Sequence, residues 1–182
     1  MVYDGVIKGK FVSLRSITVD DAEFSYNIRA DKNNCDTVGQ LASDINAQRE
    51  FIQKQIEKPG DYYFVVANNK NERIGLIGIY DIHDDIGEFG REVNIGEPME
   101  TIEATLLLND FCKDVLHLKK ICYVIYENNK RNISNANKRG GNFIKKIERS
   151  GRIALYYEDD VEEVNENNMK LRKMIDRLAK RV

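Results

Sequence analysis

Two glutamates close together in the sequence, Glu88 and Glu92, are of the residue type that can act as a general base. Glu92 lies inside an expected strand, Phe89–Ile95, and Glu88 directly precedes that strand. A carboxylate beside a reacting amine can take its proton, directly or through a water molecule. The alternative is that Glu92 is a solvated strand residue paired with Arg91 or Lys120. We take Glu92 as the first choice for a catalytic base and Glu88 as the second.

The surroundings of these glutamates follow from strand and helix geometry. Side chains alternate along a strand, so Gly90, Glu92 and Asn94 are expected to share one face of it. Arg29, at the end of an expected helix, can bind an anionic group of a substrate. A cation at a helix C-terminus also has a structural reason, because it complements the helix dipole.

The sequence contains no recognisable metal or disulfide pattern. His83 lies in an acidic turn with no second histidine nearby. The three cysteines, Cys35, Cys112 and Cys122, are odd in number and include no CxxC pair. We therefore expect no bound metal and no disulfide framework, and a reducing cytoplasm is the expected location.

Size and composition predict a single soluble domain. The chain has 182 residues, of which 42% are hydrophobic and 32% charged, and its formal net charge is −2. This balance does not favour a broad basic surface for nucleic acid. No apolar run approaches the ~20 residues that span a bilayer, and residues 1–4 lack a signal-peptide pattern. We expect one domain over residues 1–182, with neither nucleic acid nor membrane as a partner.

The first half of the chain predicts a strand, two helices and an antiparallel hairpin. Thr18, three residues before Asp21, is typical of a capped helix start, and Ser43 is expected to cap the second helix. The expected elements are a strand at Lys10–Arg15, helices from Thr18 to Ala30 and from Ser43 to just before Pro59, and strands at Tyr62–Ala67 and Arg73–Ile82.

The second half predicts one parallel step in the sheet. Pro98 suits the first turn of a helix, and a strand–helix–strand unit normally pairs its strands in parallel. The expected elements are strands at Phe89–Ile95 and Lys120–Tyr126, helices at Met99–Leu116 and Arg131–Arg139, one or two strands within residues 143–157, and an amphipathic helix from Val164 to Lys180.

Together these elements predict an α+β fold with a mixed, mostly antiparallel sheet and helices on both faces. The core is expected at about residues 8–160. The C-terminal helix, at about residues 162–181, is expected to serve in packing or in a homodimer contact.

In this order, several segments resemble the GNAT superfamily of acyl-CoA-dependent N-acetyltransferases, in the branch that acts on ribosomal proteins and amino sugars. The spacing of Asn129, Lys138 and Gly140 is similar to that of the family's cofactor-side helix. The other segments that carry the resemblance are Gly9–Ile17, Asp20–Ala22, Ile28–Asp31, Arg73–Gly78, Glu103–Phe111, Lys119–Ile121 and Glu127–Asn129.

The resemblance implies acetyl-CoA as co-substrate, bound where the strands at Phe89–Ile95 and Lys120–Tyr126 part. It implies that backbone amides hold the pantetheine arm and the developing oxyanion, that the N-terminus of the central helix holds the phosphates, and that asparagines hold the arm from the other side. On this sequence those positions are Val93, Asn94 and Ile95; Glu100, Thr101 and Ile102; and Asn128 and Asn129.

The resemblance also implies a small amine as the acceptor, contacted by Arg29 and Tyr80, and best interpreted as an amino-sugar nucleotide for surface glycans or flagellin. Acetylation of a protein N-terminus, and an inactive module for acyl-CoA binding or assembly, are the alternatives. Two departures from the family keep the inactive module open. Residues 96–101 lack the glycine-rich phosphate signature, and Ala136 stands where many relatives carry a tyrosine.

Overall fold

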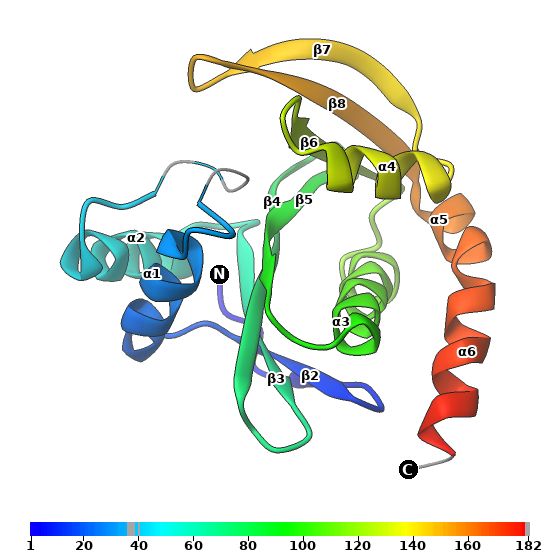
Figure 1. The fold of residues 1–182 in the computed structure, drawn as a ribbon, viewed down its shortest axis with the longest axis horizontal. Helices are drawn as coiled ribbons and strands as arrows, with labels where there is room; N and C mark the ends of the chain where they lie inside the picture. The colour runs from blue at the N-terminus through cyan, green and yellow to red at the C-terminus, as the bar shows by residue number, and fades with distance from the viewer. Residues whose placement is uncertain (36–38, 40, 181–182) are drawn as a thin grey trace.

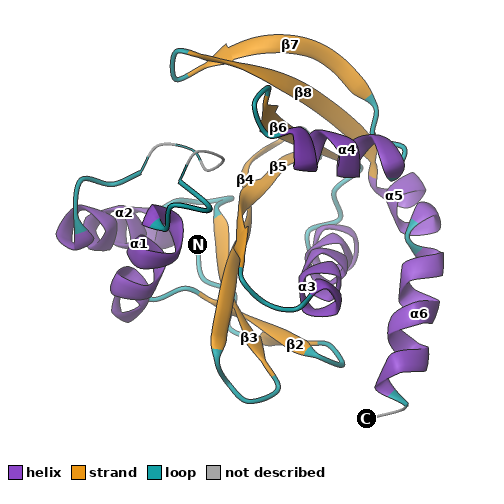
Figure 2. Ribbon diagram, in the orientation of Figure 1, coloured by secondary structure: helices purple, strands orange, loops and turns teal. Residues whose placement is uncertain are grey.

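The computed structural model describes residues 1–35, 39 and 41–180. Within them, eight strands form one sheet in the order β1-β2-β3-β4-β5-β6-β8-β7. Figure 2 shows the strong twist of this sheet. The strands are β1 (Val6–Lys8), β2 (Val12–Ser16), β3 (Tyr62–Asn68), β4 (Arg73–His83), β5 (Ile86–Asn94), β6 (Lys120–Tyr126), β7 (Phe143–Arg149) and β8 (Arg152–Asp160).

Helices cover both faces of the sheet (Figure 1). On one face lie α1 (Ala22–Ala30), which follows the short 3-10 helix η1 (Val19–Asp21), and α2 (Ile45–Glu57). On the other lie α3 (Pro98–Asp110), its π-helical continuation η2 (Phe111–Val115), α4 (Lys130–Lys138), α5 (Val161–Asn167) and α6 (Met169–Ala179). We call these the α1/α2 face and the α3 face. No helix of the described chain is long and apolar enough to cross a membrane.

The sheet is mixed in the way that the sequence predicts. Among the described strands, only β5 and β6 pair in parallel, whereas the other neighbouring strands are antiparallel. A strand, α3 and a second strand form the parallel crossover. The α+β fold with a mostly antiparallel sheet is therefore confirmed.

Two hydrophobic clusters bury the two faces of the central strands. Along β4, Leu76 belongs to the cluster under α1 and α2, whereas Ile77 belongs to the cluster under α3. Both side chains are fully buried. The centre of the sheet is thus covered on both sides, as a mostly apolar strand requires.

A buried carboxylate attaches α3 to the start of β2. Glu103 accepts backbone N–H groups from Lys10, Phe11 and Val12 at 2.6–2.9 Å. A Cβ atom at Gly9 would lie 2.5 Å from the Glu103 carboxyl carbon. Glycine is required there because the turn passes so close to the carboxylate.

Helix ends show where local signals worked and where they did not. Thr18 and Asp21 form the expected capping box. The cap of α2 is Asp44, which accepts from the Ala47 amide at 2.9 Å, and not Ser43 as predicted. An aspartate in the next position offers a charged acceptor to the same helix end.

The C-terminal helix is broken where the sequence predicted one continuous helix. It is divided into α5 and α6 at Asn168, which is buried. Arg172 of α6 binds Asp110 at the end of α3 through two bonds of 2.7 and 2.8 Å, so the helix packs on the same molecule. Residue 181, included in the predicted helix, lies outside the described residues.

Candidate active site

The sheet opens between β5 and β6. The two strands pair only over Ile86–Glu88 and Lys120–Cys122. Beyond this point β5 remains paired with β4 as far as Asn94, and β6 remains paired with β8 as far as Tyr126. We call the gap between these two strand ends the strand opening. Backbone groups that face it are free to bind a ligand, because they have no partner strand there.

A β-bulge in β5 lies beside the strand opening. Gly78 faces Gly90 and Leu76 faces Val93. Between these two pairs β5 advances by three residues while β4 advances by two, so β5 contains one extra residue. The extra residue is Arg91, which has a φ of 53°. A bulge of this kind changes which face the following side chains occupy.

The bulge overturns the prediction that Gly90, Glu92 and Asn94 share a face. A Cβ atom at Gly90 would lie 2.7 Å from the Tyr80 hydroxyl oxygen, on the α1/α2 face. Glu92 instead lies on the side of α3, where the Thr105 hydroxyl of that helix lowers its pKa. Simple alternation is therefore wrong here, because it counts no extra residue.

Arg91 is fixed on the α1/α2 face. Its guanidinium donates to both oxygens of the buried Asp61, with Nη2 and Oδ2 2.9 Å apart. It also lies 4.0 Å from the ring centroid of Tyr80 and 5.4 Å from that of Phe51 in α2. These contacts hold the bulge against α2 and engage Arg91 with partners other than Glu92.

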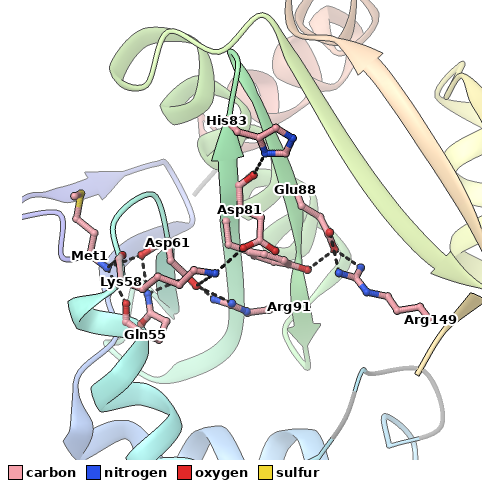
Figure 3. Close-up of polar contacts among 10 residues, drawn as sticks. Met1, Gln55, Lys58, Asp61, Asp81, His83, Glu88, Arg91 and Arg149 are labelled. Atoms are coloured by element: carbon pink, nitrogen blue, oxygen red, sulfur yellow. Dashed lines mark hydrogen bonds and ion pairs between the residues drawn. The ribbon is translucent and has the colours of Figure 1, made fainter. Parts of the chain in front are cut away.

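Glu88 lies at the narrow end of the strand opening, on the α1/α2 face (Figure 3). Its Oε1 accepts from the Tyr80 hydroxyl at 2.6 Å and also from Arg149 of β7. Its Oε2 accepts a second bond from Arg149 at 2.9 Å. Burial, and then the charge of Glu88, raises the pKa of Tyr80, so this hydroxyl stays a donor.

Glu92 lies on the α3 face, in a part of the surface that water reaches. Desolvation by the surrounding protein raises the pKa of the Glu92 carboxyl, although Arg131 of α4, Arg139 directly after that helix and the Thr105 hydroxyl act in the opposite direction. The predicted ion pair with Arg91 or Lys120 is absent, because Arg91 binds Asp61 and Lys120 binds Glu158 at 2.6 Å.

Of the three strand amides that the resemblance points to, one faces the strand opening. The Ile95 N–H donates to the Ile74 carbonyl at 2.8 Å, so it is not available to a ligand. Hydrogen-bonded and non-hydrogen-bonded pairs alternate along an antiparallel ladder. The Val93 amide therefore faces β4, and the Asn94 N–H faces away from it, into the strand opening.

The start of α3 is capped by its own carboxylates. Glu97 and Glu100 form a reciprocal capping box, in which the Glu97 N–H donates to Glu100 Oε2 at 2.8 Å. Pro98 has no N–H, and the Thr101 N–H donates to the Glu97 carbonyl at 3.0 Å. The Ile102 N–H lies one turn into the helix, where the i−4 carbonyl takes it. This helix start therefore does not fit a diphosphate in the way the resemblance implies.

The remaining predicted residues lie at the ends of α1 and β6. Asn129 is buried and caps α4, accepting from the Asn132 amide at 3.1 Å. Asn128 accepts from Arg152 at 3.0 Å, and Arg29 is buried in the last turn of α1. Of the predicted residues, Tyr80 and Glu88 are brought into direct contact with each other.

Sequence reasoning missed Arg149, and it did not assign a role to Asp61. Each lies far along the chain from its partner, and Arg149 follows Glu88 by 61 positions. No local spacing signals such a pair. The only signal was composition, since arginine is the residue type that most often binds a carboxylate through two hydrogen bonds.

Two hollows of about 530 and 470 Å³ lie elsewhere, around the start of α5 and the end of α4, and no residue of 89–94 lines either. The strand opening is identified by its backbone pairing and not by an enclosed volume. Among the described residues, no group of three or more metal-ligating side chains comes together.

Comparison with known proteins gives one family match and many structural ones. A family model described as an acetyltransferase (GNAT) domain matches residues 12–142. No curated protein matches the sequence. The fold is similar to that of a GCN5-related N-acetyltransferase from Brucella melitensis, with a TM-score of 0.79 and 13% identity over 95% of this chain and 86% of that one.

Two other similar structures differ in their described acceptors. FdhC, described as a nucleotide-linked sugar GNAT, has a TM-score of 0.75 and 20% identity over 92% of this chain and 97% of that one. Mutant forms of the spermidine/spermine N-acetyltransferase SpeG from Vibrio cholerae have a TM-score of 0.69 and 16% identity over 86% of this chain and 98% of that one. At these identities the likeness is one of fold. On the family match, which covers most of its length, this chain belongs to the GNAT acetyltransferase family.

Proposed function

We propose that this protein transfers the acetyl group of acetyl-CoA to a primary amine of an amino sugar carried on a nucleotide. The strand opening carries the proposal, because it leaves the Asn94 N–H directed into a gap between two otherwise paired strands. GNAT acetyltransferases use acetyl-CoA as the donor, and the opening lies where the family resemblance expects its pantetheine arm.

Bound acetyl-CoA supplies a thioester carbonyl, at which a carbon–nitrogen bond forms while the carbon–sulfur bond breaks and the thiol leaves. The Asn94 N–H donates to the carbonyl oxygen, whose negative charge grows as the amine attacks. The resemblance puts the donor's tail on the α3 face, so the amine approaches from the α1/α2 face. There Glu88 binds the incoming ammonium. The ammonium then loses a proton to water and becomes the amine that attacks.

Because carboxylates cap the start of α3, the donor's phosphates need cations from another part of the protein. We propose that α4 and the residue directly after it provide them, because exposed basic side chains gather there: Lys130, Arg131, Lys138 and Arg139. Arg131 and Arg139 already lie close enough to act on the pKa of Glu92. In this arrangement Glu92 lies on the donor side of the sheet and not beside the amine.

The charges on the α1/α2 face favour an acceptor that carries an anion. Three carboxylates described on this face already form ion pairs: Asp61 with Arg91, Asp81 with Lys58 at 2.6 Å, and Glu88 with Arg149. A polyamine needs carboxylates that are not already paired. An amino-sugar nucleotide brings a diphosphate to this arginine-rich face, and the fold likeness to FdhC agrees with it.

Calorimetric titration with acetyl-CoA, followed by thiol release with a panel of amines, tests the proposal. We expect binding and release of free thiol with amino-sugar nucleotides. Thiol release with peptides alone would make the protein an N-terminal acetyltransferase. Binding without thiol release would leave an acyl-CoA-binding module, and no binding at near-millimolar concentration would leave only an assembly role.

A further inference from the structure

The ion pair between Glu88 and Arg149 lies at the narrow end of the strand opening. Glu88 is the last residue of β5 that pairs with β6. Arg149 is the last residue of β7 and faces Arg152 across a two-residue turn, Ser150-Gly151. Both turn residues have positive φ, 51° and 70°, which is typical of the tight type I′ hairpin. The turn therefore fixes the backbone of Arg149 above the opening.

The two members of this pair differ in their access to water. The Glu88 side chain is only 11% exposed, whereas the Arg149 side chain is 36% exposed. A buried carboxylate without a cation is costly, so Arg149 stabilises Glu88 while no ammonium is bound. The described bonds of Arg149 to Glu88 use two of the five guanidinium N–H groups. The others remain for a second anion.

The neighbours of Arg149 add positive charge. Arg152 lies on the other side of the same turn, with its guanidinium 3.8 Å from the ring centroid of Tyr126 at the end of β6. Arg149 reaches β5 and Arg152 reaches β6, so one hairpin turn connects the two strands that border the opening. Arginine groups in this arrangement suit a phosphate, which they bind through paired N–H groups.

We propose that the acceptor replaces the Glu88–Arg149 ion pair: its ammonium binds Glu88, and a phosphate of the same molecule binds Arg149. The inference rests on the proposed function and deepens it, because it names the two residues that bind the acceptor's ammonium and phosphate and makes the phosphate a requirement for tight binding. An ion pair that exchanges both partners at once leaves no buried charge unpaired. An amine that carries no anion has to displace Arg149 from Glu88 and leaves Arg149 without an anionic partner.

One amino sugar, supplied with and without a phosphate, tests the inference. In the wild type we expect the KM of the phosphate-bearing form to be ~10- to 100-fold lower, the range of a charged hydrogen-bonded contact. In Arg149→Met this ratio should fall to about one, and in Arg149→Lys to an intermediate value. Equal KM values in the wild type, or a ratio that survives in Arg149→Met, overturn the inference.

Lys146→Met is the matched control. It removes one positive charge from the same strand, where Lys146 forms an ion pair with Glu127 at 2.7 Å and does not contact Glu88. This control should keep the wild-type ratio. Because Arg149→Met leaves Glu88 unpaired, the double variant Glu88→Gln, Arg149→Met gives a second test without a buried charge, and it too should lose the phosphate preference.

Calorimetric titration of the two acceptor forms into protein that holds CoA separates this inference from the proposed function. Preferential binding of the phosphate form supports the inference even if no acetyl group is transferred, in which case the proposed function fails alone. Thiol release with a phosphate-free amine at the same KM keeps the proposed function and overturns the inference. Binding of neither form overturns it as well.

Discussion

Glu88 and Glu92 point to opposite faces of the sheet, although they lie four positions apart on one strand, a spacing that normally keeps side chains on the same face. Glu88 binds Tyr80 and Arg149 on the α1/α2 face, whereas Glu92 lies beside α3 and α4. The bulge at Arg91 inserts the residue that reverses the alternation. The two carboxylates therefore cannot contact the same side of a ligand in the strand opening.

Substitution of each glutamate by glutamine separates their roles. Glu88→Gln should lower kcat/KM for the acceptor by ~10²-fold, since the neutral amide no longer attracts the ammonium or assists its deprotonation. Glu92→Gln should change this constant by no more than ~3-fold. Steady-state kinetics at saturating acetyl-CoA measure both, with the Kd of acetyl-CoA as a check on folding. The reverse order of effects would return the base to Glu92.

The acidic start of α3 should weaken binding of the donor. Glu100→Gln keeps the capping box but removes one negative charge, so we expect the affinity for acetyl-CoA to rise by ~3- to 10-fold at low salt. The gain should shrink as ionic strength rises. Glu166→Gln, on the exposed side of α5, is the control with the same change in net charge. Unchanged or weaker binding in Glu100→Gln would show that the negative charge at this helix start does not repel the donor's phosphates.

Glu103 should matter for stability and not for chemistry. Glu103→Ala leaves three backbone N–H groups without their acceptor, and we expect a loss of ~2–3 kcal/mol in the free energy of unfolding. Urea denaturation measures it, with Glu23→Ala on the exposed side of α1 as the control. A midpoint equal to that of the wild type would contradict the structural role.

Asp21 should make stability fall in acid. Burial alone raises the pKa of this carboxyl, but hydrogen bonds from Arg15 and Thr18 and the charge of Arg15 outweigh it and lower the pKa to about 2. The folded-state pKa lies below the unfolded one, so the stabilisation is complete above pH ~4 and is lost as the pH falls toward 2. Its size is on the order of 2 kcal/mol.

The variant Asp21→Asn tests this dependence. The difference in unfolding free energy between wild type and variant should be largest near neutral pH and should shrink toward zero by pH ~2. Denaturant unfolding at several pH values measures the difference. A gap that stays constant across this range would mean that the carboxyl contributes through packing and not through its charge.

Local signals were sufficient for most helices and for the sheet's one parallel step. The Thr18–Asp21 capping box and Pro98 at the start of α3 lie where the sequence predicts them. Both depend on residues within one turn of each other, so their physics is contained in a short segment. The strand order around α3 followed from the general rule on strand–helix–strand units.

The features that define the site could not be predicted from short segments of sequence. The bulge at Arg91 depends on how β5 pairs with β4 and on the anchor at Asp61, 30 residues earlier in the chain. The Glu88–Arg149 pair depends on how the β7–β8 hairpin lies over the sheet. Asn168, where the C-terminal helix breaks, is buried only because α5 and α6 pack on α3. Contacts between residues so far apart in the chain produce no periodic or local pattern in the sequence.

Amide NMR with added acetyl-CoA tests most directly whether the donor binds in the strand opening. We predict saturable shifts, one donor per chain, that are largest for residues 89–94 and 123–126 and include the Asn94 N–H. No shifts at near-millimolar donor, or shifts confined to residues such as Lys113 and Glu162 around the separate hollow at the start of α5, would contradict it.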